Sequence, residues 1–115
     1  MSFTAQSVID LALTLWREKS VGDIMTPEQA LLWVNQAVVK VREKRSDARF
    51  DDSEEALVYS GPLTADSVIP MADKFQLACV YFLTAHGFGR SADQQNLDKR
   101  FGDWMGLFKQ EIEQA

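Results

Sequence analysis

Residues 26–45 place the strongest constraint on the fold, because they combine a complete helix start with an apolar stripe. Thr26 is a good capping residue, Pro27 suits the first helical position, and Gln29 stands where a capping box requires it. Apolar side chains then recur every three or four residues, at Leu31, Val34, Val38 and Val41. This spacing predicts a helix that buries one face and ends near residues 44–46.

Three further segments have helical periodicity. We expect helices over residues 4–19, over residues 71–86, and from a cap at Ser91 onward, with Gly87 as a left-handed cap of the third helix. Residues 56–60 and 67–70 are short β-prone runs on either side of a Gly-Pro pair. The fold class predicted is therefore mainly α: a four-helix bundle-like domain with a short β-hairpin or extended arm between helices two and three.

Composition fits one domain over residues 1–115, with a flexible C-terminal tail at about 110–115. Hydrophobic residues make up 46% and charged residues 25% of the chain, which are ordinary globular values. The net charge of −5 disfavours a dedicated grip on nucleic acid or anionic lipid. No apolar run approaches the roughly 20 residues of a membrane helix, and the first residues lack a signal-peptide pattern. We therefore expect a cytoplasmic site of synthesis and no membrane.

Candidate chemistry is sparse. His86 is the sole histidine. It is either a catalytic base or metal ligand, or a partly buried residue at the end of a helix. Cys79 is the sole cysteine, so no intrachain disulfide forms, and two His or Cys residues are too few for a typical zinc site. Two turns of helix, roughly 10 Å, separate Cys79 from His86, which is beyond hydrogen-bond reach. We predict no catalytic residue, no metal and no cofactor, and hence no enzyme.

Two residues of the second predicted helix keep alternative interpretations. Trp33 lies off the apolar stripe, so it belongs either to the edge of the core or to a subunit contact. Asn35 is a mediocre residue for a helix interior. It is either exposed, or it ties the helix to a nearby loop or hairpin.

The order of these patterns resembles that of small phage head–tail adaptor proteins, also called head-completion or connector proteins. The resemblance covers residues 8–108 and is carried by LLWVNQAVVKVR, SDAR, an Ile-Pro pair and ACVYFLTA. These are packing patterns, and residues 21–25 are hydrophobic where that family has a polar turn. The resemblance implies a helical ring, usually a dodecamer, that docks on the portal and on a stopper or tail protein. It implies no enzyme activity and no obligatory cofactor.

Within that interpretation we expect two kinds of functional surface. The candidate subunit or partner interface comprises Trp33, Lys40, Arg42, Lys44, Arg45, Leu57, Tyr59, Val68, Gln110 and Glu111. The candidate channel-facing acidic residues are Asp51, Asp52, Glu54 and Glu55. DNA would pass this acidic surface without being specifically bound. The protein would be present in the host cytoplasm during assembly and then in the virion, at the head–tail interface.

The alternative is a different class of binding protein. A small cytoplasmic helical regulatory module would bind one protein partner through the Trp33 side of the second helix or through the face that carries Trp104. Co-purification from the native host distinguishes the two, because an adaptor brings portal protein and a regulator does not.

Overall fold

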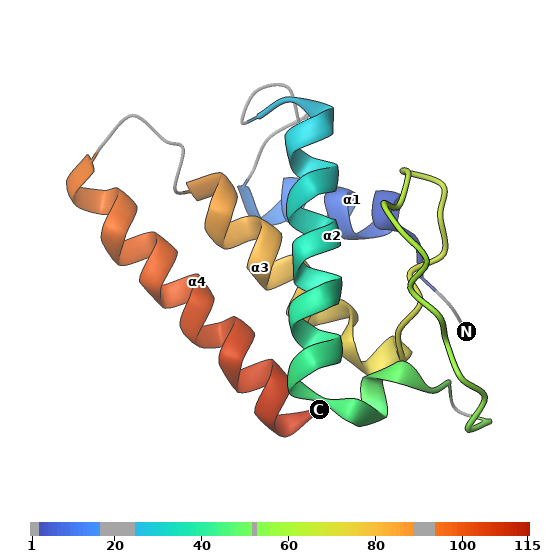
Figure 1. Cartoon of the computed structure of the whole chain (residues 1–115). Coiled ribbons are helices and arrows are strands. Elements are labelled where there is room, and N and C mark those ends of the chain that lie inside the picture. The colour runs from blue at the N-terminus through green and yellow to red at the C-terminus, as the bar shows by residue number, and fades with distance from the viewer. Residues whose placement is uncertain (1–2, 17–24, 52, 89–93) are drawn as a thin grey trace.

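The computed structural model describes residues 3–16, 25–51, 53–88 and 94–115, with side chains described up to residue 87 and again from 101. The described residues form four α-helices and two short 3₁₀ helices (Figure 1). These are α1 (Ala5–Trp16), α2 (Pro27–Lys44), η2 (Ser46–Arg49), η3 (Asp73–Phe75), α3 (Gln76–Phe88) and α4 (Gln94–Gln114). The predicted mainly helical fold is confirmed. The end of the first predicted helix (17–19) and the Ser91 cap lie outside the described residues.

Helix α2 begins as its sequence predicts. The backbone N–H of Gln29 donates to Thr26 Oγ1 at 3.2 Å, and the backbone N–H of Thr26 donates to Gln29 Oε1 at 3.1 Å. The buried side chains of α2 are Ala30, Val34, Ala37, Val38 and Val41. Leu31 of the predicted stripe is only half-buried. The reciprocal cap and the stripe therefore set both the start of α2 and the face that it buries.

Helix α3 is the centre of the molecule, since α1, α2 and α4 all pack against it (Figure 1). Its side chains include several of the largest fully buried ones in the described chain, among them Phe82, Leu83 and Val80. Most of the described side chains of α3 are buried or half-buried, because α1, α2 and α4 cover the helix. Among the described residues, no helix is long and apolar enough to cross a lipid bilayer.

Trp16 joins α1 to α3 at a position that requires glycine. Its indole N–H donates to the carbonyl of Thr84 at 3.0 Å. A Cβ atom on Gly87 would lie 2.2 Å from carbons of the Trp16 ring. Gly87 lies inside α3, and Gly61 is the one described glycine with positive φ. Our expectation of a left-handed cap at Gly87 is therefore wrong: the position is glycine because an indole ring lies against it.

The expected β-hairpin between α2 and α3 is not present in the described residues. The connection carries two isolated bridges, Phe50 with Ala56 and Thr4 with Val68. The second β-prone run pairs with the start of the chain, because Ile69 donates to the carbonyl of Phe3 at 2.8 Å. Its backbone groups thus find partners beside α1 and not in the first run, which leaves residues 50–51 and 53–72 as an irregular connection (Figure 1).

Residues 110–115, where we expect a flexible tail, are in the structure the end of helix α4 and the residue that follows it. Helix α4 continues to Gln114, and Ile112 is buried with 6% exposure. The guanidinium of Arg45 donates to the carbonyl of Ile112 and, at 2.7 Å, to that of Ala115. A cation that binds the last carbonyls of a helix satisfies acceptors that otherwise lack partners. This cross-link holds the end of α4 against the end of α2.

The substitution Gly87→Ala is expected to lower the free energy of unfolding by about 1–3 kcal/mol, because the added methyl group overlaps the Trp16 ring. Chemical denaturation measures this. Gly106→Ala is the matched control, since nothing lies within 4 Å of a Cβ at that exposed position of α4. The control should be neutral or stabilising by up to ~1 kcal/mol. Equal effects of the two substitutions would contradict the packing role of Gly87.

Candidate functional site

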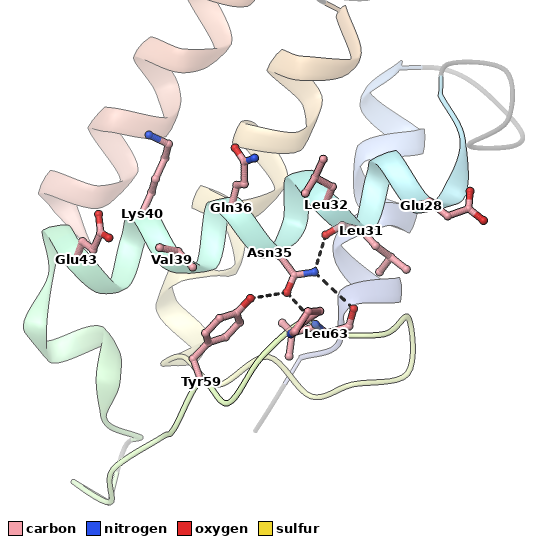
Figure 2. Close-up of a pocket in the computed structure, with 11 residues that line it drawn as sticks. Glu28, Leu31, Leu32, Asn35, Gln36, Val39, Lys40, Glu43, Tyr59 and Leu63 are labelled. Carbon is pink, nitrogen blue, oxygen red and sulfur yellow. Dashed lines mark hydrogen bonds between the residues drawn. The ribbon is translucent and has the colours of Figure 1, made fainter.

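An open groove runs along the outer side of α2 and is the candidate docking site; we call it the α2 groove. It encloses about 720 Å³. Its apolar lining is Leu31, Leu32 and Val39 from α2, and Tyr59, Pro62 and Leu63 from the connection. Figure 2 shows the connection passing alongside α2, with Glu28 and Glu43 toward the two ends of the drawn stretch. The groove therefore has one helical wall and one irregular wall.

Asn35 joins those two walls. Its Oδ1 accepts hydrogen bonds from the Tyr59 hydroxyl and from the backbone N–H of Leu63, each at 2.8 Å (Figure 2). Its Nδ2 donates to the carbonyl of Leu31 at 2.8 Å and to that of Leu63 at 3.5 Å. Of the two interpretations offered by the sequence, the tie to a neighbouring segment is the one observed. Asn35 thus holds the irregular wall against α2 at Tyr59 and Leu63.

Arg42 provides a second tie between α2 and the connection. Its Nη1 donates to the carbonyls of Leu57 at 2.8 Å and Pro70 at 2.6 Å. Burial, followed by the charge of Arg49, lowers the pKa of Arg42. Arg42 stays protonated at neutral pH, as arginine does in proteins, and its guanidinium is engaged inside the chain.

Two apolar side chains that α2 contributes to the groove remain open to solvent. Leu32 is 53% exposed and Val39 is 36% exposed, although both are on a well-anchored helix. Apolar side chains gathered in a groove with fixed walls are typical of a surface that binds another protein. The sequence indicates these two residues because each follows another apolar residue, at 31–32 and at 38–39. Adjacent helical residues point in different directions, so one member of each pair lies off the buried stripe.

His86 lies in a stack of aromatic rings and not in a polar site. Its ring is parallel to that of Trp33 with centroids 3.8 Å apart, and it also contacts the rings of Phe82 and Phe101. Burial, followed by the charge of Lys40, lowers the pKa of His86 to about 4. His86 is therefore neutral at pH 7 and packs as an aromatic ring.

Trp33 lies at the edge of the core. Its ring packs on the buried cluster, with one face against His86. Its indole N–H is buried and has no hydrogen-bond partner among the described residues. Of the two interpretations of Trp33, the structure thus shows internal packing; a subunit contact through its remaining exposed part stays a prediction.

A second groove lies between α2 and α4 and encloses about 610 Å³; we call it the basic groove. Among the residues that the structure describes, its apolar lining is Met105, Phe108 and Ile112, its cations are Lys40, Lys44, Arg45 and Lys109, and its one carboxylate is Glu113. Arg45 is paired with Asp47 at 2.8 Å, and that pair, together with Lys74, holds the pKa of Asp47 well below its usual range. The three lysines leave this groove net positive.

The acidic residues after η2 form a tight turn. The Asp51 carboxylate accepts from the backbone N–H groups of Ser53 at 2.8 Å and Glu55 at 2.9 Å. Glu54 adopts a left-handed backbone with φ of 64°, and the side chains of Glu54 and Glu55 are exposed. Asp51 is half-buried and Asp52 lies outside the described residues. Of the described acidic residues in this turn, Glu54 and Glu55 are therefore the two that extend into solvent.

The predicted interface residues do not form one surface. Arg42 and Arg45 bind carbonyls of their own chain, whereas Lys40 and Lys44 are exposed. The others are distributed between the connection (Leu57, Tyr59, and Val68 at 55% exposure) and α4 (Gln110, exposed, and Glu111, half-buried). Sequence reasoning missed Lys109 and Met105, because a groove between two helices depends on how those helices pack.

No metal-binding cluster occurs among the described residues: no three His, Cys, Asp or Glu side chains lie together in a way that could hold an ion. Cys79 is fully buried, and burial raises the pKa of its thiol, so it is protonated and inaccessible. The chain matches no protein-family model, no curated protein and no solved structure.

The substitution Asn35→Ala is expected to lower the free energy of unfolding by about 1–3 kcal/mol, because the Tyr59 hydroxyl and the Leu63 N–H lose their acceptor. Limited proteolysis should then cut the connection near residues 57–63 faster. Gln36→Ala, at the neighbouring exposed position, should change neither quantity. Unchanged proteolysis in the Asn35→Ala protein would contradict the role of Asn35 as the tie.

Stability should also fall as pH decreases from 7 to 5. The folded-state pKa of His86 lies below its usual value of 6.5, so the unfolded chain binds a proton first. The loss should be about 1 kcal/mol once solvent screening of this half-buried ring is allowed for. Denaturation midpoints across this pH range measure it. The substitution His86→Phe should remove most of this dependence of stability on pH. If the dependence is unaltered in that variant, groups other than His86 cause it.

Proposed function

We propose that this chain is a structural phage head–tail adaptor that acts by binding proteins and not by catalysis. It would assemble as a ring, by analogy a dodecamer, on the portal, and would join the DNA-filled head to a stopper or tail protein. The sequence resemblance supplies these partners. The observation that carries the binding role is the α2 groove, a preformed surface with exposed apolar side chains.

The α2 groove suits a structural binding partner because its walls are fixed before binding. Asn35 and Arg42 hold the connection against α2 through hydrogen bonds to its backbone and to Tyr59. A preorganised surface spends less binding free energy on ordering loops and side chains. Leu32 and Val39 would be the apolar contacts, with Lys40 and Glu43 as charged groups beside them.

The charge of the chain fits a conduit that lets DNA pass. A net charge of −5 provides little of the counterion release that drives DNA binding. The exposed carboxylates of Glu54 and Glu55 add to this negative surface charge. We place the protein in the host cytoplasm during assembly and in the finished virion at the head–tail interface.

The test uses virions from a phage in which this gene is replaced by variants. The wild-type chain should be found in purified virions by mass spectrometry and should co-purify with portal protein. The double substitution Leu32→Asp, Val39→Asp should abolish incorporation into virions and co-purification with portal protein. The monomer should stay folded, because the two side chains are already exposed. Leu107→Asp is the matched control, since Leu107 on α4 is 38% exposed and lies outside the groove.

The opposite result would favour the regulatory module. In that case the chain would be absent from virions, and one protein unrelated to the portal would co-purify in a manner that depends on Leu32. Retention of the double variant in virions at wild-type levels would instead show that the α2 groove does not carry the adaptor contacts.

A further inference from the structure

We infer that the basic groove between α2 and α4 receives the acidic turn, residues 50–51 and 53–55, of a second copy of this chain. The inference deepens the proposed function, on which it rests for its place in a ring. It names the two surfaces through which neighbouring copies would meet.

Charge complementarity is the first argument. Lys40, Lys44 and Lys109 line the groove, Arg45 is neutralised by its pairing with Asp47, and Glu113 is the one opposing carboxylate. The groove is thus positive within a chain whose net charge is −5. The exposed carboxylates of Glu54 and Glu55 are close neighbours on the acidic turn and provide the opposite charge.

Apolar complementarity is the second argument. The groove is lined by Met105, which is half-buried, and by Phe108, which is 4% exposed. The turn segment carries Phe50 at 44% exposure, next to its carboxylates, and Val58 at 73% exposure lies shortly after it. Each surface therefore combines an apolar part with charges of one predominant sign, so apolar contact and ion pairing can form together.

The third argument is preorganisation of the turn. Asp51 accepts two backbone hydrogen bonds within the turn, and the backbone N–H of Asp51 donates to the carbonyl of Glu55 at 2.9 Å. The turn consequently keeps its shape before it binds, and docking it requires little additional ordering.

The two surfaces lie on different parts of the molecule. The groove-lining residues and the turn residues do not overlap. In Figure 1, α4 and the connection lie on opposite sides of α2. A contact between two different surfaces of identical copies is heterologous, and such contacts close a ring when the rotation between neighbours allows it. One turn in one groove is a small interface, so each pairwise contact should be weak and ring closure should add to it.

The experiment traps this contact with a disulfide. A chain with Ser53→Cys is mixed with a chain carrying Glu113→Cys, at high protein concentration, low ionic strength and under mild oxidation. Both positions are exposed, the first substitution keeps every charge of the turn, and the second removes the one carboxylate of the groove. The native Cys79 is buried and does not compete. The cross-linked heterodimer should form in excess over the control pair Ser53→Cys with Glu28→Cys.

Charge reversal then tests specificity. Lys40→Glu with Lys44→Glu in the Glu113→Cys chain should reduce the cross-link roughly fivefold, because two exposed ion pairs become repulsive. Adding Glu54→Lys and Glu55→Lys to the Ser53→Cys chain should restore it. A heterodimer yield no higher than that of the control pair overturns the inference, and so does a yield insensitive to both charge changes.

This result is separable from the proposed function. If the chain is found in virions but the disulfide shows no excess, the contact is wrong and the adaptor role stands. If the disulfide forms with the expected charge dependence but the chain is absent from virions, self-association through these surfaces stands and the adaptor role fails.

Discussion

The burial of α3 between the other three helices is the interaction on which the rest of the structure depends. Phe82, Leu83, Val80 and Cys79 are removed from water at once by partners from three directions. Burial of this apolar surface is the main favourable contribution to folding, because a single helix of this length is marginal in water. The inner sides of α1, α2 and α4 pack on α3, so the outer sides of these helices remain available for contacts with other molecules.

The polar contacts of α2 then convert an irregular connection into part of a defined surface. Residues 50–72 form no regular strand pairing among the described residues, so their backbone groups need partners elsewhere. Asn35 and Arg42 provide those partners from α2, while Phe3 and Ala5 provide them from the start of the chain. The contacts of Asn35 also hold Tyr59 and Leu63, which line the α2 groove. The hydrogen bonds that satisfy the backbone of the connection therefore also shape a surface that can bind a partner.

Ionisable groups in this protein act mainly through packing and surface charge. His86 is stacked on Trp33 and kept neutral at pH 7, and the Cys79 thiol is enclosed in the core. The cations divide into two sets: Arg42 and Arg45 bind carbonyls inside the chain, whereas Lys40 and Lys44 remain at the surface. Arginine suits the first role because its planar group presents several donors in fixed directions, and lysine suits the second as a flexible, well-hydrated charge.

The sequence by itself determined the existence of the four helices, the capped start of α2 and most of its buried stripe, because periodicity and capping depend on residues close together in the chain. Only the tertiary structure decided that residues 67–69 pair with Phe3, that Gly87 makes room for Trp16, that Arg45 binds the end of α4, and that Leu32 and Val39 stay exposed. Each of these depends on which distant groups the packing of helices brings within a few ångströms, and local spacing carries no information about that distance.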